Sequence, residues 1–159
     1  MLPSDVGLYK ELRLEGLRET PEAFGASYRD ESTEVFTYYC ELLNDSYVFG
    51  VYGNTGILAG IAGLRISKKE KLRHKGTLWG MYIKSEARGN GLAKQLASLI
   101  IETAKETTEE LLLTVVASNI PAVNLYKALG FIEYGIEPRA LKVQGTYYDE
   151  LLMLLRLET

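Results

Sequence analysis

Residues 119–131 read Asn-Ile-Pro-Ala-Val-Asn-Leu-Tyr-Lys-Ala-Leu-Gly-Phe, and this stretch carries the strongest indication of the fold. Its spacing predicts a short helix that ends at Gly130, whose missing Cβ suits the left-handed position after a helix. Asn119, Ala122 and Tyr126 stand at positions i, i+3 and i+7, so they share one face. A polar cap, a small residue and a phenol are therefore expected to line up beside each other.

A second stretch, Arg88–Ala93 (RGNGLA), lies between a strand that ends at Ile83 and a helix that starts near Gly91. Two glycines so close to a helix start allow positive φ angles and bring several N–H groups towards one point. The helix dipole alone contributes only about 0.3–1 kcal/mol to anion binding. Several charge-assisted hydrogen bonds of roughly 1.5–3 kcal/mol each could hold a pyrophosphate.

Two other nucleotide-binding loops fit this stretch less well. A Walker A loop needs Gly-Lys-Ser/Thr, which is missing here. A dinucleotide fingerprint needs a third glycine where Lys94 stands and a loop that starts directly at the strand end, whereas residues 84–87 intervene. Glu109 and Glu110 do lie at about the distance expected of a ribose-binding carboxylate.

The rest of the chain predicts a mixed α/β sheet, from its alternation of helical and extended patterns. Helices are expected over residues 5–20, 36–43, 91–104 and 119–129, and strands over 47–52, 57–65, 77–83, 111–116, 131–134, 140–143 and 147–155. The apolar run 111–116 is typical of a strand covered on both faces in the interior of a sheet. Gly80, inside the strand 77–83, suggests a bulge.

Composition limits the function. A chain of 159 residues with 47% hydrophobic content is expected to form one domain, 1–159. Cys40 and His74 are the only residues of their kinds, so we expect no disulfide, zinc cluster or metal site. A net charge of −3 argues against nucleic acid and mildly favours a cationic or neutral substrate. Without a leader or an apolar run of membrane length, the sequence favours a cytoplasmic protein with no membrane contact.

The two stretches together resemble the GNAT N-acetyltransferase superfamily. Its first motif, Arg/Gln-x-x-Gly-x-Gly/Ala, is matched by Arg88, Gly91 and Ala93. Its second, Asn-x-x-Ala-x-x-Leu-Tyr-x-x-x-Gly-Phe, is matched completely by residues 119–131, and with the strand before each motif the resemblance covers Thr77–Phe131. It implies an α/β (α+β) GNAT fold: a mixed, mostly antiparallel central sheet, about four flanking helices and an acetyl-CoA cleft between the two central strands.

The resemblance also implies an activity and a site. The chain would move an acetyl group from acetyl-CoA (coenzyme A) to a primary amine, of a small molecule or a peptide, by direct attack in a ternary complex. The strand would pair with the pantetheine arm, the glycine turn would hold the pyrophosphate, Asn119 would contact the pantetheine or acetyl end, and Tyr126 would protonate the departing sulfur. The cofactor-binding residues so implied are Met81, Tyr82, Ile83, Arg88, Gly89, Asn90, Gly91, Leu92, Ala93, Lys94, Asn119, Ala122 and Tyr126.

Some points stay open in the sequence. The family usually has a strand before its first helix, but here only residues 1–4 precede Asp5, so that strand is truncated or absent. Candidates for the general base are Glu31, Glu34, and a water chain leading to Tyr148 or Asp149. A non-catalytic acyl-CoA sensor on the same fold is the alternative function, and a homodimer is left open.

Overall fold

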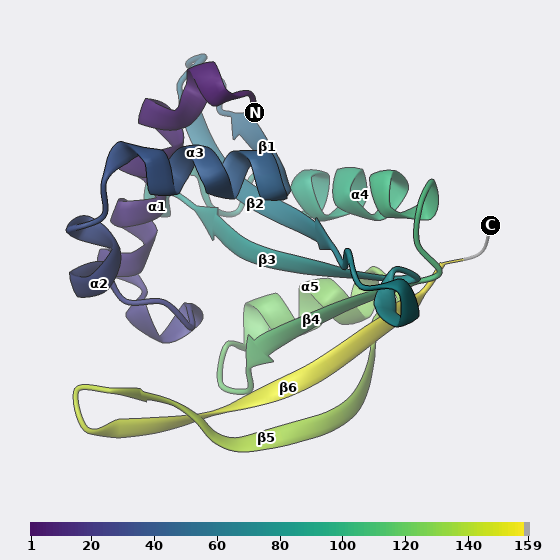
Figure 1. The fold of residues 1–159 in the computed structure, drawn as a ribbon. Helices are drawn as coiled ribbons and strands as arrows, with labels where there is room; N and C mark the ends of the chain where they lie inside the picture. Colours follow the sequence, from purple (N-terminus) through teal and green to yellow (C-terminus); the bar gives the residue numbers. More distant parts are fainter. Residues whose placement is uncertain (158–159) are drawn as a thin grey trace.

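The computed structural model describes residues 1–157, which form a six-stranded sheet flanked by helices (Figure 1). The strands are β1 (Tyr47–Tyr52), β2 (Leu58–Ile66), β3 (Lys75–Ile83), β4 (Glu110–Val116), β5 (Ile132–Val143) and β6 (Thr146–Arg156). The α-helices are α1 (Val6–Glu19), α2 (Tyr28–Ser32), α3 (Phe36–Asp45), α4 (Leu92–Lys105) and α5 (Ile120–Ala128). Four 3-10 turns, η1 to η4, cover Pro3–Asp5, Pro21–Ala23, Glu70–Leu72 and Ser85–Ala87.

The sheet order is β1-β2-β3-β4-β6-β5, and every neighbouring pair is antiparallel except β3 and β4. The predicted mixed, mostly antiparallel sheet is therefore confirmed. Five α-helices rather than about four flank it, because the short α2 was not expected. Its N-cap Ser27 accepts a hydrogen bond from the backbone N–H of Asp30 at 3.1 Å, which starts a single turn of helix.

Two apolar cores lie on opposite faces of the sheet. Helices α4 and α5 pack on one face, where Leu64, Ile100 and Leu111 are fully buried. Helices α1 and α3 pack on the other face with Tyr9 and Tyr39. Neighbouring side chains of one strand point to opposite faces, so β2 contributes to both cores. No helix among the described residues is long and apolar enough to cross a bilayer.

Three details differ from the sequence-based expectation. Strand β4 is interior, as predicted, but only one of its faces is fully covered, because the side chain of Thr114 is exposed. Strand β5 is one strand rather than two, with irregularities after Glu133 and Glu137. The strand before the first helix is replaced by η1, and the Met1 amino group donates to the carbonyl of Val48 on β1.

The sheet opens at its centre. Strands β3 and β4 pair only over Lys75–Thr77 and then diverge, as Figure 1 shows. On its other edge, β3 has a shift in its pairing with β2 opposite Ala62, and Gly80 adopts φ +63 there. The predicted bulge at Gly80 is thus confirmed. A bulge bends a strand and re-aims its groups, and this one lies beside the opening.

Candidate active site

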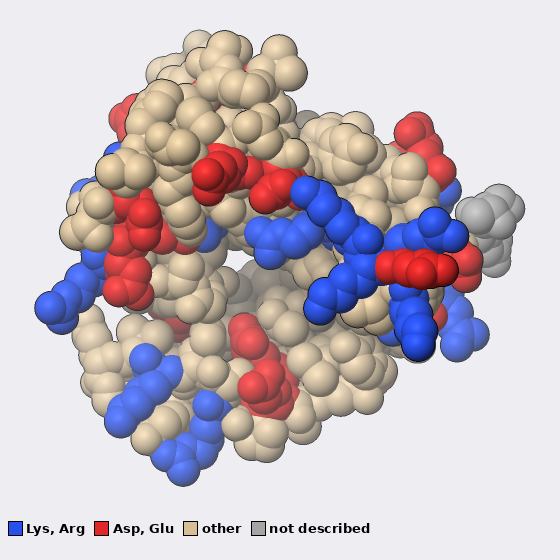
Figure 2. Space-filling model, in the orientation of Figure 1, with Lys and Arg blue, Asp and Glu red and all other residues tan. Residues whose placement is uncertain are grey.

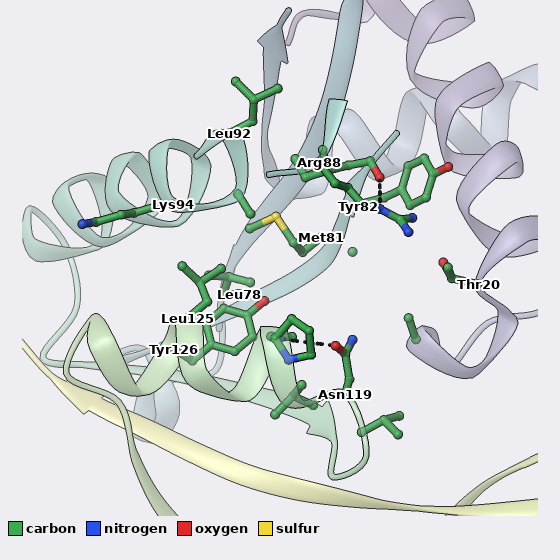
Figure 3. A pocket seen from close by; sticks show the side chains of 18 of the residues that line it. Thr20, Leu78, Met81, Tyr82, Arg88, Leu92, Lys94, Asn119, Leu125 and Tyr126 are labelled. Carbon is green, nitrogen blue, oxygen red and sulfur yellow. Dashed lines mark hydrogen bonds between the residues drawn. The ribbon is translucent and has the colours of Figure 1, made fainter. Parts of the chain in front are cut away.

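A cleft of about 570 Å³ occupies the opening between β3 and β4 (Figures 2 and 3). Its walls are β3, the turn before α4, the end of β4 and the helix α5. All the residues that the resemblance implied as cofactor-binding line it except Asn90. The Asn90 side chain turns back instead and donates to the carbonyl oxygens of Ala87, at 3.2 Å, and Arg88, at 3.4 Å.

The glycine turn presents a row of unpartnered backbone amides. Gly89 and Gly91 adopt φ +79 and +76, which confirms the predicted left-handed conformations. Within residues 1–157, the N–H groups of residues 89–94 donate to no protein acceptor, and Gln95 is the first to donate, to the carbonyl of Gly91 at 3.0 Å. These amides, at the positive end of the α4 dipole, form a local anion-binding surface.

Two cations flank this turn. Arg88 donates from Nε to the carbonyl of Ile83 at 3.0 Å, and its guanidinium lies 5.8 Å from the centre of the Tyr82 ring. This bond ties the turn to the end of β3. Lys94, in the first turn of α4, extends into solvent (Figure 3). Both side chains can add positive charge to the surface of free amides.

Strand β3 offers main-chain groups to the cleft. Lys84, just after β3, donates its N–H to the carbonyl of Ala59 on β2, which is the side of β3 away from the cleft. Successive residues of a strand direct their N–H groups to opposite sides. The N–H groups of Met81 and Ile83 therefore point towards the cleft, and that of Tyr82 does not. The Tyr82 phenol instead anchors β3 to α1, donating to the carboxylates of Glu19 at 2.8 Å and Glu15 at 3.1 Å.

Tyr126 is the buried phenol of the cleft. Its side chain is 5% exposed and packs edge-on against Phe131, with ring centres 5.7 Å apart. Burial raises the pKa of Tyr126 to about 12. The hydroxyl makes no hydrogen bond to any residue in 1–157, and Figure 3 shows it pointing towards β3 across the cleft. It is therefore a protonated donor at neutral pH that has no protein acceptor.

Asn119 begins the helix that carries Tyr126. Its Oδ1 accepts a hydrogen bond from the N–H of Ala122 at 3.3 Å, so the predicted N-cap is confirmed. The residue also lines the cleft, with Ala122 and Tyr126 on the same face of α5. Gly130, with φ +94, follows the helix as its left-handed end.

The sequence did not indicate the far wall of the cleft. Thr20, Glu22 and Ala23, in and just before η2, complete the lining. Their only sequence signal is that Pro21 favours the first position of a helical turn. Phe24, which follows them, is buried and fixes the segment to the α1 core.

None of the four candidates for the general base lines the cleft. Glu31 is 4% exposed and forms a bidentate ion pair with Arg13, from Nε to Oε2 at 2.6 Å and from an Nη to Oε1 at 2.5 Å. Asp149 accepts from the N–H of Arg139 at 2.7 Å in the β5–β6 hairpin. Both carboxylates thus have structural partners away from the cleft.

Known proteins resemble this chain in sequence and in fold. The acetyltransferase of the GNAT family from Streptococcus pneumoniae superposes with a TM-score of 0.85 at 24% identity, over 99% of this chain and 96% of that one. A phosphinothricin acetyltransferase from Sinorhizobium meliloti, solved with acetyl-CoA, gives 0.83 at 18% identity, over 99% and 85%. N-alpha-acetyltransferase 30 of Saccharomyces cerevisiae is 30% identical over 81 residues, which are 50% of this chain and 46% of that protein.

The family model of the GNAT acetyltransferases matches residues 13–131. This range holds the diverging strands, the glycine turn with its free amides, and the helix of Asn119 and Tyr126. It accounts for most of the chain, and the fold as a whole superposes on those of the solved relatives. The chain belongs to the GNAT acetyltransferase family.

Proposed function

We propose that this protein is an N-acetyltransferase that transfers an acetyl group from acetyl-CoA to a primary amine, by direct attack in a ternary complex. The observation that carries the proposal is the cleft itself. Its rim has a row of backbone N–H groups without acceptors, and its interior has a buried phenol without one. The first N–H groups of a helix have no acceptor within the helix and can bind an anion, and the phenol faces the cleft. Both features suit a bound molecule with an anionic end and a reactive end.

The residues present fit coenzyme A. The amides of Gly89 to Lys94, with Arg88 and Lys94 beside them, would hold the pyrophosphate. The main chain of β3 at Met81 and Ile83 would pair with the pantetheine arm, and the small side chain of Ala122 leaves room for it. Bound acetyl-CoA would supply the acetyl group as a thioester.

Two further steps are assigned to groups of the chain. An N–H of β3, at Met81 or Ile83, would stabilise negative charge on the carbonyl oxygen. Tyr126 would donate its proton to the departing sulfur, since burial keeps the phenol protonated. Cys40, the single cysteine, does not line the cleft, so the proposal includes no acyl-enzyme.

A thiol-release assay tests the function. The protein would be incubated with acetyl-CoA and, in turn, with diamines and polyamines, amino acids, aminoglycosides and short peptides with free N-termini. We expect release of coenzyme A that depends on one class of amine. Tight binding of acetyl-CoA with no release for any amine would contradict the proposal and support a sensor on the same fold.

A further inference from the structure

Two carboxylates face each other beside the cleft. Glu137 on β5 and Glu150 on β6 are direct partners in the antiparallel pairing of these strands. Like charges directly opposite each other on neighbouring strands destabilise a sheet. A group that binds between them and carries positive charge would relieve this repulsion.

Neither carboxylate lines the cleft itself, and the pair adjoins it through β4. Glu150 is opposite Val116 in the β4–β6 pairing, and the side chain of Thr114 lies close enough to act on the pKa of its carboxyl group. Both Thr114 and Val116 line the cleft. Because alternate residues of a strand share a face, Thr114 and Glu150 lie on the same side of the sheet.

A feature of the cleft on another element also indicates a ligand. Tyr126 is 5% exposed and lines the same cleft as Thr114, and its hydroxyl makes no hydrogen bond to any residue that the structure describes. The cleft thus has an unpartnered proton donor on α5 and, beyond Thr114, a pair of potential proton acceptors on the hairpin. Figure 2 shows acidic side chains along the lower border of the hollow.

Glu137 on β5 is the charged group that acts on Glu150. Its neighbour Thr114 on β4 is uncharged, and Glu22 of η2, which lies against β4 and β5, lines the cleft. The guanidinium of Arg139 lies 3.7 Å from the centre of the Tyr147 ring. Burial raises the pKa of Glu150, the Glu137 carboxylate raises it further, and the nearby Thr114 hydroxyl lowers it. No basic group among the described residues counteracts the increase.

We propose that Glu137 and Glu150 bind the acceptor as a cationic primary amine and that Glu150 is the base that removes its proton. This inference rests on the proposed function and adds the acceptor class and the base. The ammonium gives one proton to Glu150, and its free electron pair then forms the new bond to the thioester carbon. The bond from that carbon to sulfur breaks, and Tyr126 gives a proton to the sulfur. The nitrogen loses its second proton as the amide forms, and this proton restores the phenol.

A carboxylate with a raised pKa suits this role. Proton transfer is most effective when the pKa of the base lies near the operating pH. An exposed glutamate with a pKa of about 4.3 is a weak base for an ammonium ion at neutral pH. Partial burial beside a second carboxylate makes Glu150 a stronger base than an exposed glutamate. Glu137 keeps negative charge near the bound cation.

The kinetic test uses three variants of the full chain with acetyl-CoA and 1,4-diaminobutane as the acceptor. Glu150→Gln should lower kcat at least tenfold and remove the acid limb of the pH profile. Glu137→Gln should move that limb to lower pH, because one cause of the raised pKa is gone. Glu133→Gln is the matched control: it removes one β5 carboxylate, which pairs with Lys127 at 2.7 Å, and should leave kcat and the limb unchanged.

A second measurement does not need turnover. The side-chain carboxyl carbon of Glu150 is followed by NMR against pH in protein with labelled glutamate, and Glu150→Gln assigns the signal. Adding 1,4-diaminobutane should lower the apparent pKa of Glu150, whereas 1-butanol should not change it. An unchanged pKa with the diamine, or a Glu150→Gln variant with full kcat and an intact acid limb, would overturn the proposal.

The two proposals fail in different ways. Calorimetry with acetyl-CoA should give the same Kd for the wild-type protein and for all three variants. Absence of acetyl-CoA binding, or of turnover by the wild-type protein with every amine of the thiol-release panel, would refute the proposed function while the NMR titration still tests the pair. Normal turnover with no effect at Glu137 and Glu150 would refute only the acceptor site.

Discussion

Arg13 on α1 and Glu31 on α2 form a buried bidentate ion pair directly behind the wall of the cleft. The Arg13 guanidinium lies 5.4 Å from the centre of the Trp79 ring on β3, and a Cβ at Gly80 would be 3.3 Å from one of its nitrogens. The pair therefore supports β3 from behind at its bulge. This arrangement gives Glu31 a structural role in place of the chemical one considered for it.

Breaking this ion pair should lower the free energy of unfolding. Glu31→Gln leaves the buried guanidinium without its counter-charge, and loss of one partner of a buried pair costs about 3–5 kcal/mol. For a chain of this length, that corresponds to a fall in Tm of roughly 10 °C. Asp45→Asn is the control, since it removes an ion pair with Lys68 in which both side chains are largely exposed. Equal Tm values for the two variants would show that the buried pair does not support the fold.

The glycine turn can be tested with a matched backbone change. Gly91→Ala puts a Cβ where φ is +76 but nothing lies within 4 Å, so strain alone costs about 1–2 kcal/mol. If the turn relaxes, its amides diverge, and the affinity for coenzyme A should fall about tenfold or more. Gly56→Ala is the control, because Gly56 has φ +75 and open surroundings in the β1–β2 hairpin away from the cleft. Equal calorimetric Kd values for coenzyme A in the two variants would show that the turn does not bind the cofactor.

The parts of the site that follow from local rules were predictable from sequence. Positive φ at Gly89 and Gly91, the bulge at Gly80 and the shared face of Asn119 and Tyr126 all depend on near neighbours in the chain. Even the burial of Arg13 had a signal, because it stands four residues from both Tyr9 and Leu17, on the apolar face of α1.

The position of the proposed acceptor site, at Glu137 and Glu150, could not be predicted from the sequence, and the reason is physical. Whether Glu137 faces Glu150 depends on the register of a hairpin that is irregular at two places, and one shift moves every side chain to the other face. One of these irregularities involves Arg139, which has φ +55 and whose N–H is satisfied by the Asp149 side chain. The contact of η2 with β4 and β5 likewise depends on tertiary packing, and no sequence pattern marks it.

Removing the phenol of Tyr126 should change the rate and little else. Tyr126→Phe loses no protein hydrogen bond, so the free energy of unfolding and the Kd for acetyl-CoA should stay near the wild-type values. The value of kcat should fall by roughly 10²–10⁴-fold, the usual contribution of a positioned acid. Tyr39→Phe should show the opposite pattern. It loses a buried hydrogen bond to the carbonyl of Glu31, 2.6 Å long, at a cost of about 1 kcal/mol, and keeps kcat.

The pH dependence gives the same phenol a second test. An acid catalyst works while it is protonated, and the pKa of Tyr126 is raised to about 12. The group therefore stays active as pH rises and is lost only near pH 12. Between pH 7 and about 10, the plot of log kcat against pH should show no falling limb. A falling limb with a midpoint well below 10 would contradict protonation of the sulfur by this phenol.

Asn119 combines two roles that substitution can separate. Its Oδ1 caps α5, and the side chain lines the cleft, where its Nδ2 can donate to a ligand. Asn119→Ala should cost about 1 kcal/mol of stability and also weaken acetyl-CoA binding. Asn119→Asp keeps the capping oxygen and adds a charge that the helix dipole favours, so stability should be retained or slightly increased. The aspartate offers no donor, and its Kd for acetyl-CoA should rise as much as that of the alanine variant. Wild-type affinity in the aspartate variant would make Asn119 a helix cap only.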